Sequence, residues 1–197
     1  MPSTFCFIGN NTYKDCGSMK HGMKKLKKLR MFHDENSKDE VLPVKEALGD
    51  VFGIETTEVI HFEAKTVKGA YNANREQYDA SILLSYLIKD KNRGAKESSL
   101  SLWMVSDDIY VKGMNFVFGV AQPGKAAILS IHRLDSLDLI KKEAIHELGH
   151  VFGLQHCTNY CVMQFSNSLY EARMKPDRLC NKCSTLLRLR VQKAPEF

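Results

Sequence analysis

The sequence predicts a mixed fold of the α/β or α+β class, because segments with helical periodicity and segments with strand composition occur together along the chain. The chain has 197 residues, of which 44% are hydrophobic and 26% are charged. A chain of this length can bury roughly 70% of its unfolded surface, so it needs no disulfides to fold. No apolar run approaches the roughly 20 residues that cross a bilayer. We therefore expect a globular protein without a membrane partner.

The first 40 residues are predicted to form a basic, partly ordered arm. They hold eight Lys and Arg against five Asp and Glu, which is most of the net charge of +5. Residues 3–8 could form a short strand, and residues 9–40 are polar enough for a loop or weak helix. The acid-free basic run at residues 19–30 could contact nucleic acid, but a solvated arm is favoured and a nucleic-acid partner is unlikely. Residues 41–197 are predicted as a single folded domain.

A helix, a strand and a second helix are expected next. Pro43 can open a helix, apolar residues recur at helical spacing up to Phe52, and Gly53 can end it. Residues 58–62 are β-branched and apolar, which is typical of a strand. Residues 75–90 carry an apolar face with helical spacing and predict the second helix. A polar loop follows at residues 91–99.

Three strands and two helices complete the predicted order. Residues 100–105, 115–121 and 125–131 have strand composition, and Pro123 and Gly124 form the turn between the last two. Ser136 can cap a long helix that ends at Gly153. Pro176 can open a final helix that runs to about Arg190.

Residues 146–156, HELGHVFGLQH, have the spacing of a metal site. His146 and His150 are four residues apart, so on a helix they share one face and can meet one ion. Glu147 can reach a metal-bound water without being a ligand, and the turn at Gly153 can return His156 as a third ligand. Three nitrogen ligands leave one tetrahedral position open, which is the catalytic zinc pattern. The alternative is a buried helix whose histidines are satisfied by hydrogen bonds. Glu143, one turn before Glu147, could orient a ligand from behind, but a solvated helix-surface carboxylate is favoured.

Four of the six cysteines have the spacing of a structural zinc site: Cys157, Cys161, Cys180 and Cys183. They form two close pairs with an eighteen-residue gap. The first residues contain no secretory signal, so we expect a cytoplasmic protein and no disulfide framework. Buried free thiols are the alternative. Cys180 and Cys183 are three residues apart at the start of the last predicted helix, where the helix N-terminus favours thiolates.

From His146 to Cys183 the chain resembles the archaemetzincins, a branch of the metzincin zinc peptidases. The shared features are a cysteine directly after the third histidine, a Cys-x-Met at residues 161–163, and a Cys-x-x-Cys at residues 180–183. Residues 70–72, 75–78, 115–119 and the strand near residues 126–134 also resemble the family. The resemblance covers roughly residues 41–190.

This resemblance implies an α+β, zincin-like fold with a mixed β-sheet packed against helices and an active-site helix that carries the first two zinc ligands. It implies two zinc ions per chain. The catalytic ion would lie on His146, His150 and His156, with Glu147 as general base and acid. The structural ion would lie on Cys157, Cys161, Cys180 and Cys183 and tie the C-terminal helix. Met163 matches the Met-turn below the zinc. Phe165 stands where some metzincins carry a tyrosine, and it cannot hydrogen-bond an oxyanion.

The expected function is hydrolysis of peptide bonds by a zinc-activated water, with Glu147 moving the proton. A strand that borders the cleft and pairs with an extended peptide is predicted at Asn115, Phe116, Val117, Phe118 and Gly119, although plain core packing would explain it equally well. One alternative is a catalytically weak zinc-binding or peptide-interaction protein. The other is a nucleic-acid-associated zinc protein that uses the basic arm. The expected partner is a peptide or protein substrate, and the expected state is a monomer.

Overall fold

The computed structural model describes residues 28–89 and 99–193 of the chain. The strand predicted at residues 3–8, most of the predicted basic arm and most of the loop predicted at residues 91–99 lie outside these residues. Within them, no helix combines the length and the apolar character needed to cross a bilayer.

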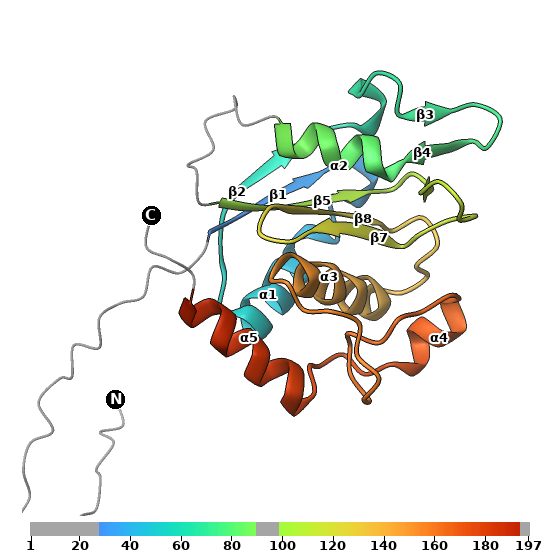
Figure 1. Ribbon diagram of the computed structural model, residues 1–197. Helices are drawn as coiled ribbons and strands as arrows, with labels where there is room; N and C mark the ends of the chain where they lie inside the picture. The colour runs from blue at the N-terminus through green and yellow to red at the C-terminus, as the bar shows by residue number, and fades with distance from the viewer. Residues whose placement is uncertain (1–27, 90–98, 194–197) are drawn as a thin grey trace, which may run out of the picture.

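A five-stranded mixed sheet runs through the middle of the protein (Figure 1). Its order is β2 (Glu55–His61), β1 (Lys28–His33), β5 (Ser99–Val105), β8 (Ala126–Ser130) and β7 (Gly119–Gln122). The first four strands are parallel, whereas β7 runs antiparallel to β8. In the register of β7, Gly119 lies opposite Leu129 and Gln122 opposite Ala126. The turn between these strands contains Gly124 at a φ of 73°, as the predicted hairpin requires.

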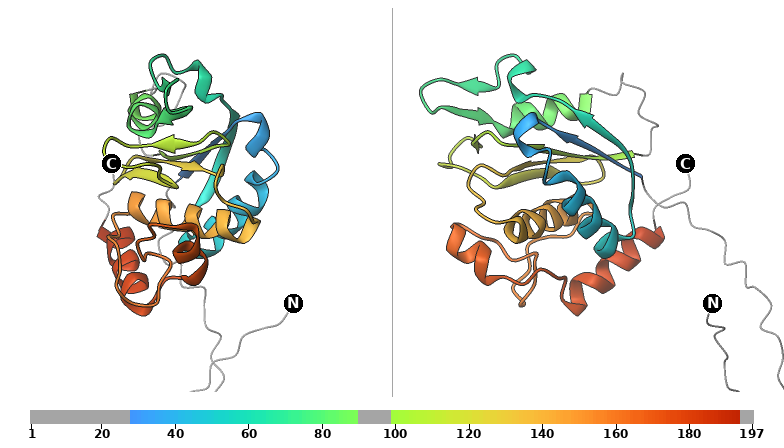
Figure 2. Two further views of the ribbon diagram at one scale, coloured as in Figure 1. Left: turned by 90° about the vertical axis from the view of Figure 1, so that its right-hand side faces the viewer. Right: turned by 180° about the vertical axis from the view of Figure 1, so that it is seen from behind.

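Helices cover both faces of this sheet. Helix α2 (Ala80–Lys89) lies on one face, and α1 (Val41–Phe52) and α3 (Leu137–Val151) lie on the other (Figures 1 and 2). Each face has its own core. Trp103 and Ile128 pack with the α2 side, and their neighbours Met104 and Leu129 pack with the α1 and α3 side. Successive strand residues point to opposite faces, so β5 and β8 are buried on both.

The remaining elements lie at two ends of this layered body. A small second sheet has the order β3 (Tyr71–Asn72), β4 (Gln77–Asp79) and β6 (Ile109–Tyr110). Short 3-10 helices occur at Glu35–Ser37 and Ala64–Thr66. Helices α4 (Leu169–Met174) and α5 (Asn181–Lys193) lie beyond α3, on the side away from the sheet (Figure 1).

The predicted mixed sheet with helices packed against it is confirmed, and so are several predicted boundaries. Helix α1 ends at Gly53, whose φ of 59° is left-handed. The Ser136 side chain caps α3 by accepting a hydrogen bond from the Leu139 amide. The chain leaves α3 at Gly153, with a φ of 83°.

The prediction of a loop or weak helix is wrong for residues 28–33, which form strand β1 in the sheet. Arg30 belongs to the run that indicated a solvated arm, yet its side chain is only 4% exposed. Its Nε lies 2.9 Å from the Glu58 carboxylate of β2, which compensates the buried charge. Residues 28–33 therefore belong to the folded body, which was predicted to begin at residue 41.

Three further boundaries differ from the prediction, the first because strand pairing overrides local helical periodicity. Residues 77–79 form strand β4 instead of the first turn of a helix, since Tyr78 pairs with Tyr71 and Ile109. Residues 115–118 precede strand β7 and are not part of it. The last helix begins at Asn181, and the short helix α4 before it was not predicted.

Candidate active site

Helix α3 and the turn that follows it bring three histidines together. His146 and His150 lie one turn apart on α3, with ring centroids 4.6 Å apart. After Gly153 the chain turns back, and the ring of His156 lies 4.8 Å from that of His150 and 5.4 Å from that of His146. Each residue offers one nitrogen, and these atoms all lie within 4.8 Å of one another.

Hydrogen bonds to the backbone define which nitrogen of two histidines is free. His146 Nδ1 lies 2.9 Å from the Val162 carbonyl, and His150 Nδ1 lies 2.8 Å from the Leu154 carbonyl. Carbonyl oxygens only accept, so each Nδ1 carries the proton and each Nε2 presents a lone pair. These two Nε2 atoms are 3.0 Å apart.

Two facing lone pairs at this distance repel each other unless a cation lies between them. Tetrahedral zinc with bonds of about 2.0–2.1 Å separates two nitrogens by roughly 3.3 Å, so the donor set fits a zinc ion. Burial lowers the pKa of all three histidines, most strongly that of His146. Burial thus favours the neutral imidazole, which is the form that binds a metal.

Glu147 lies next to the histidines but contributes no atom to their cluster. It is 5% exposed. Burial, and then the nearby carboxylate of Glu143, raise the pKa of Glu147 to about 8, although the ammonium of Lys175 opposes this. A carboxylate in such surroundings can exchange a proton near neutral pH.

Behind His146 lies a buried ion pair that sequence reasoning missed. The ammonium of Lys175 lies 2.8 Å from the Glu143 carboxylate, and the two side chains are 1% and 3% exposed. The expectation that Glu143 is a solvated carboxylate is therefore wrong. The same ammonium lies 3.4 Å from His146 Nδ1, which is longer than the bond from that nitrogen to Val162. No local pattern marks the pair, because its members are 32 residues apart.

Met163, the predicted Met-turn residue, packs against α3 at Gly149, between His146 and His150 in the sequence. It is fully buried, and its sulfur packs so closely on Gly149 of α3 that a Cβ at Gly149 would overlap it. The Cys157 amide donates to the Met163 carbonyl at 2.9 Å, and the carbonyl of the preceding residue receives the His146 hydrogen bond. This turn therefore orients one imidazole from behind.

The four predicted cysteines also converge, with sulfur atoms that all lie within 4.8 Å of one another. The sulfurs of Cys157 and Cys180 are 3.8 Å apart, far beyond the roughly 2.05 Å of a disulfide. Four sulfurs around zinc at about 2.3 Å would be about 3.8 Å apart, so this set also fits zinc. Burial disfavours the Cys180 thiolate, but hydrogen bonds from the Cys183 backbone and the Asn159 amide outweigh this and lower the Cys180 pKa to about 6.

A cleft of about 260 Å³ opens over the three histidines. One wall is made by Met114, Phe116, Val117 and Phe118, and continues into β7 at Gly119. The lining also includes Phe165, whose ring lies 4.9 Å from that of His156. The segment predicted to border a cleft does line this one, although residues 115–118 approach it as a loop. Asn115 contributes only its backbone to holding that loop in place.

The chain matches the model of peptidase family M54 over residues 35–189. This chain belongs to that family. It is 48% identical to the archaemetzincin of Nanoarchaeum equitans over 114 residues, which are 58% of this chain and 64% of that relative. It is 40% identical to the archaemetzincin of Methanopyrus kandleri over 159 residues, covering 76% of this chain and 85% of the relative.

A solved structure agrees with these relatives. The crystal structure of archaemetzincin from M. kandleri superimposes with a TM-score of 0.73 at 34% identity, covering 85% of this chain and 97% of that one. The predicted archaemetzincin family, the α+β fold and the class of zinc-dependent metallopeptidase are thereby confirmed.

The upstream residues that resemble archaemetzincins meet at the cleft wall. Arg75 donates to the carbonyl of Asn115 at 2.7 Å, and Gln77 donates to the same oxygen at 3.0 Å. Arg133 stacks on the Phe116 ring at 4.3 Å and binds both carboxylate oxygens of Asp108, at 2.8 and 2.6 Å. Sequence reasoning singled out Arg75 and Gln77 without a role. Their role is to hold the loop that forms one wall of the cleft in this M54 peptidase.

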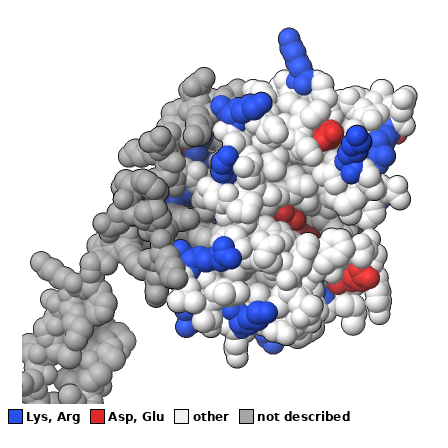
Figure 3. All heavy atoms as spheres, in the orientation of Figure 1, with Lys and Arg blue, Asp and Glu red and all other residues white. Residues whose placement is uncertain are grey.

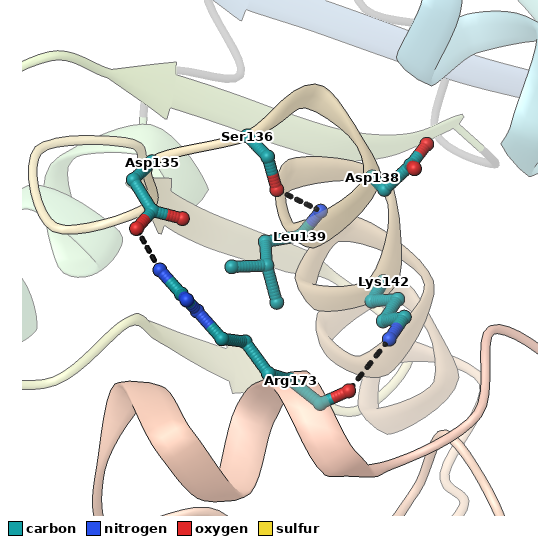
Figure 4. Close-up of a pocket in the computed structure, with 6 residues that line it drawn as sticks. All are labelled: Asp135, Ser136, Asp138, Leu139, Lys142 and Arg173. Atoms are coloured by element: carbon teal, nitrogen blue, oxygen red, sulfur yellow. Dashed lines mark hydrogen bonds and ion pairs between the residues drawn. The ribbon is translucent and has the colours of Figure 1, made fainter.

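A second depression, of about 410 Å³, lies at the start of α3 and contains none of the predicted site residues. Most of its polar groups bind neighbouring residues of the same depression (Figure 4). Arg173 pairs with Asp135, the Ser136 hydroxyl caps the helix, and Lys142 donates to the Arg173 carbonyl at 3.0 Å. This region joins α4 to α3 and offers no reactive group.

Proposed function

We propose that this chain hydrolyses peptide bonds with a zinc ion held by His146, His150 and His156. The observation that carries the proposal is the pair of Nε2 lone pairs 3.0 Å apart on the floor of a cleft. A bound zinc ion supplies a Lewis acid and lowers the pKa of a coordinated water toward 7.

The protein's own contribution to the chemistry is proton transfer and orientation. Glu147 lies beside the histidines without joining them, so its carboxylate is free to accept a proton from the attacking water. The same oxygen can then deliver that proton to the leaving amine. Val162 and Leu154 hold two imidazoles by their Nδ1 atoms and so keep the Nε2 atoms aimed at one point.

Substrate binding is proposed along the edge of the main sheet. Strand β7 is the terminal strand of that sheet among the described residues, and its first residue borders the cleft. An extended peptide can add to such an edge by main-chain hydrogen bonds. Phe116 and Phe165 give the cleft apolar walls, which favour substrates with apolar side chains next to the cleaved bond.

We further propose that the four cysteines hold a second, structural zinc ion that ties α5 to the active-site loop. Free thiols that lie close together also support a reducing compartment such as the cytoplasm. We further propose that the protein is a monomer. On the face shown in Figure 3, the Lys and Arg of the described residues are scattered and form no continuous basic surface, so this face gives the nucleic-acid alternative no support.

A catalytically weak peptide-binding protein is the second candidate, and Phe165 is the observation that favours it. This residue is 50% exposed beside His156 and offers no hydrogen bond to an oxyanion. Stabilisation of the oxyanion would then fall mainly to the metal.

Digestion of a peptide library by the zinc-loaded protein, read by mass spectrometry, tests the proposal. We expect defined cleavages that Glu147→Ala slows by about 10²- to 10⁴-fold while zinc stays bound. His150→Ala should lose both zinc and cleavage. Glu46→Ala, which removes an exposed carboxylate of α1, is the matched control and should cleave like the wild type. A wild type that binds zinc but cleaves nothing would favour the peptide-binding candidate.

A further inference from the structure

Gly119 lies where strand β7 passes closest to Glu147. A Cβ built on Gly119 would lie 2.6 Å from both Cγ and Cδ of Glu147, and 2.7 Å from the Ile128 carbonyl oxygen. Carbon atoms in normal contact are about 3.5–4.0 Å apart. The side chain of Glu147 therefore occupies the space that any other residue at position 119 would need.

Space, and not backbone conformation, is what requires glycine here. Five glycines of the described residues have a positive φ, and Gly119 is not one of them. Its backbone conformation is open to any residue, and the ladder with β8 holds it opposite Leu129. Glu147 is held as well, because it belongs to helix α3 and is 95% buried. Its carboxylate therefore has little room to move away from Gly119.

We propose that Gly119 is a positioning residue for Glu147: the missing side chain lets the carboxylate lie against the edge strand, beside the three histidines. This inference rests on the proposed function of Glu147 as the group that moves the proton. An alanine at position 119 would push the carboxylate away by about 1 Å, the difference between 2.6 Å and normal contact. Misplacement by about 1 Å can lower a rate by roughly 10²-fold.

Steady-state kinetics on a peptide that the wild type cleaves test the catalytic part. Gly119→Ala should lower kcat by about 10²-fold, with KM changed much less and zinc content unchanged. Gly49→Ala is the matched control, because a Cβ there meets only the Ile54 carbonyl oxygen at an ordinary 3.9 Å. A Gly119→Ala enzyme with the kcat of the wild type would overturn the proposal, and so would a loss confined to KM.

Shortening Glu147 tests whether the two residues act through each other. Glu147→Asp withdraws the carboxylate by one methylene and should slow the wild type. In the Gly119→Ala background the carboxylate is already displaced, so shortening it should cause a smaller further loss of kcat than in the wild type, although the aspartate Cγ still lies near the added Cβ. Losses that simply add in the double variant would contradict the inference.

A second double-mutant cycle measures thermal stability instead of catalysis. It therefore separates failure of this inference from failure of the proposed function. Glu147→Ala removes Cγ and Cδ, so Gly119→Ala should lower the thermal midpoint far less in that background than in the wild type. The contact with the Ile128 carbonyl is the same in both and cancels in the comparison. Equal losses would overturn the inference. If the wild type cleaves nothing, the proposed function fails, and this cycle still decides whether Gly119 sets the place of Glu147. If Gly119→Ala does not fold, a folded double variant supports the contact with Glu147, whereas an unfolded one shows that the Ile128 carbonyl alone excludes a side chain and contradicts the inference.

Discussion

Lys175→Met should destabilise the protein far more than the loss of any surface lysine. The substitution leaves the Glu143 carboxylate, 3% exposed, without the ammonium that now lies 2.8 Å away. Breaking a buried ion pair from one side costs about 3–5 kcal/mol, because the remaining charge is desolvated and uncompensated. In a chain of this size, each kcal/mol lost from the free energy of unfolding lowers the thermal midpoint by about 2–4 °C. The expected loss is therefore roughly 6–20 °C.

Urea and thermal unfolding of the zinc-loaded protein measure this effect, with bound zinc determined in parallel because Lys175 also lies near His146. The double variant Lys175→Met with Glu143→Leu removes both charges and should recover most of the loss. Lys38→Met is the control. That lysine is 62% exposed and 4.0 Å from Glu35, so its loss should change stability by about 0.5 kcal/mol or less. If Lys175→Met lowers stability no more than Lys38→Met does, the pair is not the compensated buried charge described above.

Three other outcomes are expected. Cys183→Ser should lower the thermal midpoint and reduce bound zinc from about two ions per chain to about one, because a structural zinc contributes folding free energy; elemental analysis and calorimetry check this. Burial opposes ionisation of Asp108, but hydrogen bonds from Arg133 and Gln77 outweigh it and lower the pKa. The stability that Asp108 adds is thus present above about pH 4 and is lost below it, so Asp108→Asn should differ from the wild type at neutral pH and converge with it in acid unfolding curves. Ser136→Ala should cost about 1 kcal/mol in urea denaturation by removing the cap of α3, and an unchanged midpoint would contradict that role.

Local features of the sequence predicted the helix of the active site well. Ser136, the four-residue spacing of His146 and His150, and the turn at Gly153 act over a few residues, and the periodicity of a helix makes their arrangement computable. The convergence of the cysteines was predictable for a related reason. The short spacing within each pair brings two ligands together with little loss of chain entropy on loop closure.

Contacts between distant segments were not predictable. Arg30 belongs to a basic run, and only the position of Glu58 on the neighbouring strand makes it a buried residue of the sheet. The pairing of Glu143 with Lys175 likewise depends on how the segment after α4 packs on α3. Gly119 had a place in a predicted strand, but the need for glycine appears only when Glu147 lies against it. In each case one residue has an ordinary local signature, and its partner, far along the chain, determines its role.

The hydrogen bonds behind His146 have a consequence for the order in which the site forms during translation. The carbonyl of Val162 orients this imidazole, and the amide of Val162 donates to the Arg178 carbonyl at 2.9 Å. The Cys180 amide in turn donates to the sulfur of Cys161 at 3.2 Å. A ribosome-bound chain that ends before residue 178 has the complete helix α3 but lacks the segment that braces the loop under it. The nascent chain therefore lacks the hydrogen bonds that brace the loop under α3 until residues 178–180 have been synthesised.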